Sequence, residues 1–147
     1  MASQENFEKL VYEFQYLRSV SDSIQQRIEM INATAGEIQI ATTTLEGIGN
    51  EEPGSSMLVP IGGGSYVWAK LDNREKIIVG VGADVAVEKT IASAKEDFQT
   101  RILELEKAHT ILQKQFEEIS TKMSGLQREI QKITQQPSGK TEDVRGA

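Results

Sequence analysis

Two long stretches in which apolar residues recur at alternating three- and four-residue intervals limit what this chain can fold into. The first runs from Phe7 to Leu45, and large apolar side chains occupy nine of its twelve seam positions. A mean spacing of 3.5 residues places these side chains along one side of a helix, which is typical of a coiled coil. We expect this helix to occupy residues 1–50 and its seam to extend about 60 Å. The seam consists of Phe7, Leu10, Phe14, Leu17, Ser21, Ile24, Ile28, Ile31, Ala35, Ile38, Thr42 and Leu45.

A second stripe with the same spacing predicts a C-terminal coiled-coil helix over residues 84–136, ending before Pro137. Its seam takes a four-residue step between Phe98 and Ile102 where three is due, a stutter that locally unwinds a supercoil. Residues 137–147 lack apolar periodicity and are expected to form a disordered tail. The second seam consists of Ile91, Ala94, Phe98, Ile102, Leu105, His109, Leu112, Phe116, Ile119, Met123, Leu126, Ile130 and Ile133.

The segment between the stripes, residues 51–83, has the composition of short β-strands. The runs "MLVPI", "SYVWAKL" and "KIIVGVG", with a fourth strand "DVAV" near 84–87 at the start of the second helix, are rich in Val, Ile and aromatic residues. Gly62–Gly64, residues 72–75 and Gly82 with Ala83 accept turn geometry. The pattern therefore predicts two β-hairpins.

Two helices of similar length joined by a short β segment are expected to fold back on each other, because the intramolecular partner is at high effective concentration. The expected fold class is α+β, a long antiparallel two-helix coiled coil with two β-hairpins between the helices. Matched lengths predict that facing residue numbers add to about 137, which places Ser21 near Phe116 and Ala35 near Ile102, with a register one heptad away as the alternative.

The predicted strands carry apolar side chains on both faces, so the hairpins are not expected to be stable alone on a two-helix rod. Closing strands from several chains into a β-barrel would cover these faces and remove the strand edges. We therefore expect the hairpins to join an oligomeric β-barrel platform. The oligomerisation residues expected from this pattern are Val67, Ala69, Ile77, Val79 and Val81.

Composition argues against several partner classes. The chain has 16 Lys and Arg against 22 Asp and Glu, a formal net charge of -6, and no basic patch. Nucleic acid and anionic membrane are therefore poor partners. With no cysteine, no signal-like N-terminus and no run of about 18 apolar residues, a soluble protein of the cytoplasm is the expectation.

The motifs that could support chemistry are incomplete. Gly62–Gly64 lead into a strand without the lysine of a phosphate-binding loop, and "GVGADV" at 80–85 has Val85 in place of a third glycine. His109 is the only histidine and lies on the seam, where it is better explained as a half-buried polar layer than as a ligand or base. We expect no catalytic, cofactor-binding or metal residues, and no enzyme.

Apolar residues outside the seam gather near the start of the first helix, at Val11, Tyr12 and Tyr16. Exposed apolar patches commonly mark interaction sites. A better-packed coil end or an oligomer contact explains the same residues equally well, and the sequence leaves the alternatives open.

The arrangement resembles the prefoldin family, specifically the alpha class of the archaeal complexes, over residues 7–135. The sequence segments that support the resemblance are "LVPIGGGSYVWAKL", with Pro60 and Gly62–Gly64, and "IIVGVGADVAVEKTIASA", which leads into the second helix. Two hairpins rather than one are a mark of the alpha class.

This resemblance implies a hexamer of two alpha and four prefoldin beta subunits, with a double β-barrel platform and six coiled coils. It implies an ATP-independent holdase co-chaperone that holds unfolded client proteins at the coil tips and passes them to a group II chaperonin. The rival interpretation is a structural coiled-coil adaptor or tether joining two folded partners. The implied client-binding residues are Phe7, Leu10, Val11, Tyr12, Phe14, Tyr16, Met123, Leu126, Ile130 and Ile133.

Overall fold

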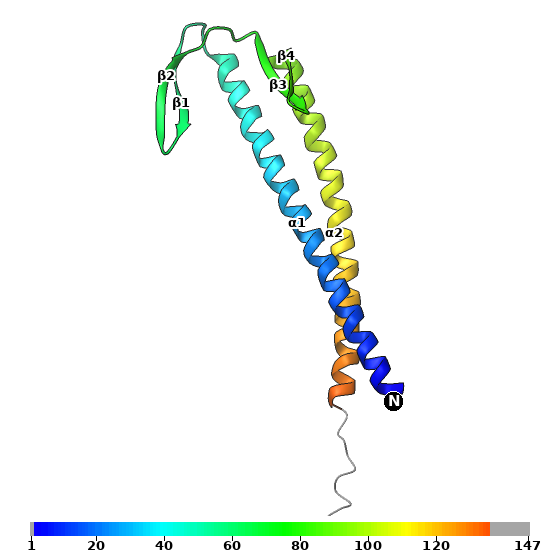
Figure 1. Cartoon of the computed structure of the whole chain (residues 1–147). Coiled ribbons are helices and arrows are strands. Elements are labelled where there is room, and N and C mark those ends of the chain that lie inside the picture. Colours follow the sequence, from blue (N-terminus) through cyan, green and yellow to red (C-terminus); the bar gives the residue numbers. More distant parts are fainter. Residues whose placement is uncertain (1, 136–147) are drawn as a thin grey trace, which may run out of the picture. The chain divides into compact units, whose positions relative to one another are not determined.

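The computed structural model of the chain describes residues 2–135, in which two long helices flank two β-hairpins (Figure 1). This confirms the expected combination of elements. The expected tail at 137–147 lies outside the described residues. In chain order the elements are α1 (Ala2–Asn50), β1 (Ser56–Gly62), β2 (Ser65–Lys70), β3 (Lys76–Gly82), β4 (Val85–Thr90) and α2 (Ile91–Gln135).

The second helix begins at Ile91, later than expected, since the segment predicted for it began at 84 with a fourth strand only near 84–87. The difference arises because β4 continues to Thr90 and pairs along its length with β3, from Val79 opposite Val87 to Lys76 opposite Thr90. Backbone groups committed to a strand ladder are not available for helical hydrogen bonds. The hairpin segment therefore occupies residues 51–90.

The described chain forms two compact units. Unit 1 contains residues 2–31 of α1 and 108–135 of α2, and unit 2 contains residues 32–107. In unit 1, residues 27–31 share a groove with 108–112, and residues 19–27 share another with 115–122. Residue numbers fall along α2 as they rise along α1, so in this unit the two helices run antiparallel, as expected.

The register of the helix pair differs from the expected one. In unit 2, Lys95 Nζ lies 3.9 Å from Glu46 Oε1, and the numbers of these two residues add to 141 rather than 137. In this unit the predicted facing of Ala35 with Ile102 is therefore shifted by about one helical turn. The cause is the late start of α2, since the ends joined through the hairpins are Asn50 and Ile91.

Side-chain burial confirms the two predicted seams. Every seam position of α1 and of α2 is buried or half-buried, and His109 is half-buried among them. The off-seam residues Tyr12, Ile40 and Leu103 are exposed. A single apolar stripe on each helix thus accounts for the pairing of the helices within each unit.

The two hairpins share one backbone design. Each is antiparallel and has a β-bulge, between Pro60 and Gly62 in the first and between Gly80 and Gly82 in the second. Gly63 and Gly64 form the first turn with φ values of 59° and 71°, in the left-handed region that favours glycine. The glycine run therefore turns the chain, as predicted.

Candidate interaction surfaces

The β3–β4 hairpin is attached to the helices of its own unit. Val79 is 6% exposed and packs in a small core with Leu45 and Ala94. The half-buried residues Ile77, Ile91 and Phe98 surround this core. One face of the hairpin is therefore covered by its own chain.

Polar contacts reinforce this attachment. The Lys89 ammonium donates to the Asp97 carboxylate, across the junction of β4 and α2. Arg101 Nη2 of α2 donates to the backbone oxygen of Gly80 at 3.5 Å. Both bonds connect the hairpin to the first turns of α2, so the two elements are held together at several points.

The β1–β2 hairpin has much less support. Among the described residues, no side chain of β1 or β2 is buried. Trp68 is 76% exposed and lies opposite Leu58, while the neighbouring pair Val59 and Val67 is also exposed. Successive residues of a strand point to opposite faces, so this hairpin presents apolar side chains on both faces.

The predicted oligomerisation residues fall into two groups. Val67 and Val81 are exposed, whereas Ala69 and Ile77 are half-buried and Val79 lies in the core of its own chain. Val79 thus serves the attachment of its own hairpin. Exposed apolar residues that the prediction left out include Leu58, Val59, Ile61, Tyr66, Trp68, Ile78, Val85 and Val87. The sequence already indicated apolar residues on both faces of the strands, but the prediction assigned only part of them to the oligomer.

The predicted client-binding residues all belong to unit 1. Tyr12 and Tyr16 are 73% and 61% exposed, Val11 is half-buried, and Leu10 is buried. The remaining members are half-buried in the helix pair: Phe7, Phe14, Met123, Leu126, Ile130 and Ile133. The two tyrosines, one helical turn apart on α1, are the part of this set that solvent meets directly.

The residue spacing did not predict a second apolar feature of unit 1. A groove of about 450 Å³ lies between α1 and α2 and is lined by Arg27, Met30, Ile31, Ala108, Ile111 and Leu112. Met30 and Ile111 are largely exposed within it. Each lies beside a seam residue, so the spacing analysis assigned neither a role.

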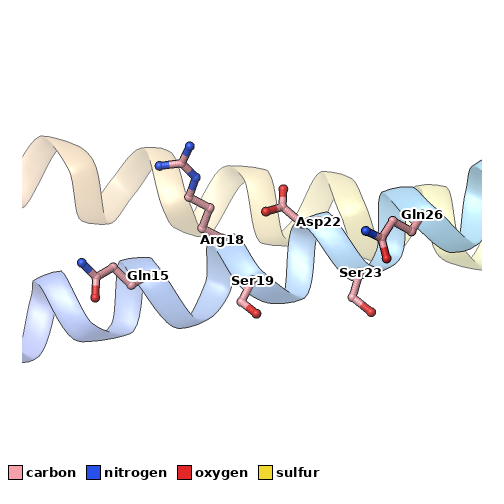
Figure 2. Close-up of a pocket in the computed structure, with 6 residues that line it drawn as sticks. All are labelled: Gln15, Arg18, Ser19, Asp22, Ser23 and Gln26. Atoms are coloured by element: carbon pink, nitrogen blue, oxygen red, sulfur yellow. The ribbon is translucent and has the colours of Figure 1, made fainter.

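Other depressions of the described surface are lined mainly by polar residues. One of about 510 Å³ is formed by α1 alone, where Arg18, Asp22 and the neighbouring Ser and Gln side chains project from the helix surface (Figure 2). Within residues 2–135, no three His, Cys, Asp or Glu side chains come together as a metal site would require. Neither α1 nor α2 is apolar enough over a sufficient length to cross a membrane, as far as the described residues go.

Comparisons with known proteins agree with this architecture. A family model described as prefoldin subunit matches residues 17–136. "Prefoldin subunit alpha" of Pyrococcus horikoshii is 31% identical over 137 residues, covering 92% of this chain and 93% of its own length. "Prefoldin subunit alpha" of Nitrosopumilus maritimus is 40% identical over 106 residues, covering 71% of each chain.

A solved structure shares the fold. A chain of filamentous PFD from Methanocaldococcus jannaschii, determined by cryo-EM, superposes with a TM-score of 0.68 at 21% identity and covers 83% of this chain and 98% of its own. Paired helices and intervening hairpins thus define the coiled-coil fold that this chain shares with PFD. The chain belongs to the prefoldin family, a family of chaperone subunits.

Proposed function

We propose that this chain is an alpha-type prefoldin subunit acting as an ATP-independent holdase co-chaperone, which captures unfolded proteins and delivers them to a group II chaperonin. The observation that most strongly supports this is the family match over residues 17–136. A holdase shifts a non-native chain away from aggregation by mass action and needs no chemical step. The cytoplasm is the proposed location, because a chain without cysteine suits a reducing compartment.

Assembly is proposed to occur through residues 51–90, as two copies of this chain with four beta-type subunits. The β1–β2 hairpin supports this proposal, since its two apolar faces and its strand edges need cover that residues 2–135 do not supply. Strands from several subunits closing into β-barrels would provide that cover. The expected contacts include Val67 and Val81 together with the exposed aromatic residues Tyr66 and Trp68.

Client capture is proposed at the free end of unit 1, which we define as residues 7–16 of α1 and 123–133 of α2. Tyr12 and Tyr16 offer exposed apolar surface there. Half-buried seam residues such as Phe7 and Met123 become accessible when helix ends fray. A large side chain contributes about 1.5–3 kcal/mol when fully buried, so several coil ends acting together hold a client through many weak contacts.

The test measures how well the assembled complex protects a chemically unfolded client from aggregation, without nucleotide. Replacing Tyr12 and Tyr16 with Ser is expected to reduce protection severalfold, because it removes apolar surface without touching the seam. Ile40→Ser is the matched control, since Ile40 is equally exposed on α1 but lies in unit 2. Light scattering must show the same complex size for each variant.

A larger change removes the residues before Tyr16 together with those after Ser124. Intact assembly with lost protection is the expected result. Undiminished protection would contradict the assignment, and a Met30→Gln, Ile111→Gln variant would then show whether the groove of unit 1 holds the client. A tether, the rival function, would not suppress aggregation even as the wild-type protein.

A further inference from the structure

The C-terminal end of α1 is capped in part by the chain that follows it, since Glu51 N donates to Ile48 O at 3.1 Å. The last four carbonyl groups of a helix have no partner within it. The last turn of α1 contains no basic residue, and Gly47 and Gly49 lower helix propensity just before Asn50. This end, from which the chain enters the β1–β2 hairpin, is therefore weak on its own.

Arg74, in the connector between the two hairpins, supplies a further donor at this end. Its Nη1 donates to the backbone oxygen of Glu51 at 2.9 Å and lies 3.5 Å from that of Gly49. A guanidinium at this position also meets the negative end of the helix dipole. A residue that follows the β1–β2 hairpin in sequence thus binds the backbone at the end of the preceding helix and just beyond it.

In the same region, backbone hydrogen bonds join the two ends of the β1–β2 hairpin. Gly54 N donates to Leu71 O at 2.6 Å, and Leu71 N donates to Ser55 O at 2.9 Å. Asn73 Oδ1 accepts from Glu75 N at 2.8 Å and shapes the connector around Arg74. The chain that leaves α1 and the chain that returns from β2 are therefore joined to each other and, through Arg74, to the helix end.

We propose that Arg74 is a positioning residue that fixes the β1–β2 hairpin in the orientation needed for assembly with other subunits. The β3–β4 hairpin is held by the core around Val79, whereas no side chain of β1 or β2 is buried in the described chain. The orientation of the first hairpin therefore depends on its base. This inference rests on the proposed assembly function.

The test begins with amide hydrogen exchange on the full-length chain without partners. Arg74 is exposed, so Arg74→Ala opens no cavity and should leave the helical circular dichroism and the melting temperature almost unchanged. Exchange at residues 48–55 and 71–75 should become severalfold faster. Arg74→Lys, which keeps a cationic donor, should restore most of the protection. Unchanged exchange in Arg74→Ala overturns the proposal.

The second measurement is the affinity of the chain for a beta-type prefoldin subunit, by sedimentation or light scattering. Arg74→Ala should weaken assembly by about tenfold, the size expected for loss of a charged hydrogen bond, and Arg74→Lys should weaken it less. Arg101→Ala is the matched control, because it removes an arginine–carbonyl bond from the hairpin that the core already holds. Equal weakening by both alanine variants overturns the proposal.

These measurements separate the inference from the function on which it rests. If the wild-type chain does not assemble, the proposed function fails, and the exchange experiment still decides whether Arg74 holds the hairpin base. If Arg74→Ala loses its helical signal, Arg74→Gln, which keeps a donor without charge, takes its place in both measurements. Wild-type behaviour of that variant in both exchange and assembly overturns a role for the charge.

Discussion

The two hairpins have the same strand pairing and the same bulge, yet they relate to the rest of the chain in opposite ways. The β3–β4 hairpin buries Val79 against Leu45 and Ala94, while the β1–β2 hairpin leaves Trp68 and Tyr66 in solvent. The difference lies in side chains, not in backbone geometry. Small branched residues suit a close fit on two helices, whereas large exposed aromatic residues suit a partner that has yet to bind.

The largest effect is expected for Val79→Asp, which breaks the attachment of β3–β4. An unpaired carboxylate in this core costs about 3–5 kcal/mol, so the melting temperature of the isolated chain should fall by many degrees. Ile78→Asp is the control, because Ile78 is the adjacent residue and is 74% exposed. Thermal unfolding followed by circular dichroism measures the melting temperatures of both variants. Equal melting temperatures would contradict the proposed difference between the two faces of β3.

The second effect concerns assembly rather than folding. Trp68→Ser should leave the melting temperature of the isolated chain nearly unchanged, because its side chain is exposed there. Loss of a buried aromatic at an interface costs about 2–4 kcal/mol, so affinity for a beta-type subunit should fall by more than tenfold. Light scattering over a titration measures it. Wild-type affinity would show that the exposed face of β1–β2 takes no part in assembly.

Much of this architecture follows from the sequence because it depends on local periodicity. The seams from Phe7 to Leu45 and from Ile91 to Ile133, the fold-back and the glycine turn are all encoded within neighbouring residues. The register is not, because it depends on where β4 ends and α2 begins, and Glu88 and Lys89, which follow the predicted strand, are good helix formers. The helix start was therefore placed too early and the pairing shifted by a turn.

The candidate surfaces were predictable only in part. Sequence alternation shows which residues of a strand share a face but not which face its own helices cover, so Val79 was assigned to the oligomer instead of to its own core. The groove around Met30 and Ile111 depends on how two helices pack, which no single stripe reveals. The straightening expected near the stutter between Phe98 and Ile102 stays a prediction.

A smaller effect is expected from substitutions in the turns of the two hairpins, because the turns differ in their backbone. The first turn uses glycines, whereas the second places Ala83 and Asp84 at positive φ values of 51° and 59°. Left-handed backbone costs an L-residue about 1–2 kcal/mol. Gly63→Ala should therefore destabilise the first hairpin by about 1 kcal/mol, while Ala83→Gly should stabilise the second slightly. Site-resolved hydrogen exchange measures the stability of each hairpin. The first hairpin must lose protection in Gly63→Ala, and the second must gain it in Ala83→Gly.

The smallest effect is expected for Lys89→Ala. The ion pair of Lys89 with Asp97 is partly exposed, and such pairs contribute about 0–1 kcal/mol and weaken with salt. Stability should fall by about 0.5 kcal/mol at low salt and by less at high salt. Urea unfolding at two salt concentrations checks this. A loss comparable with that of Val79→Asp would mean that charge, and not the core, holds β3–β4.

The most direct measurement is hydrogen exchange of both hairpins before and after a beta-type subunit is added. In the isolated chain, amides of β1–β2 should exchange much faster than those of β3–β4, because only the latter are supported by a core. On assembly, β1–β2 should gain the greater protection. Equal protection of the two hairpins in the isolated chain, or no gain at β1–β2 on adding the partner, would contradict the account.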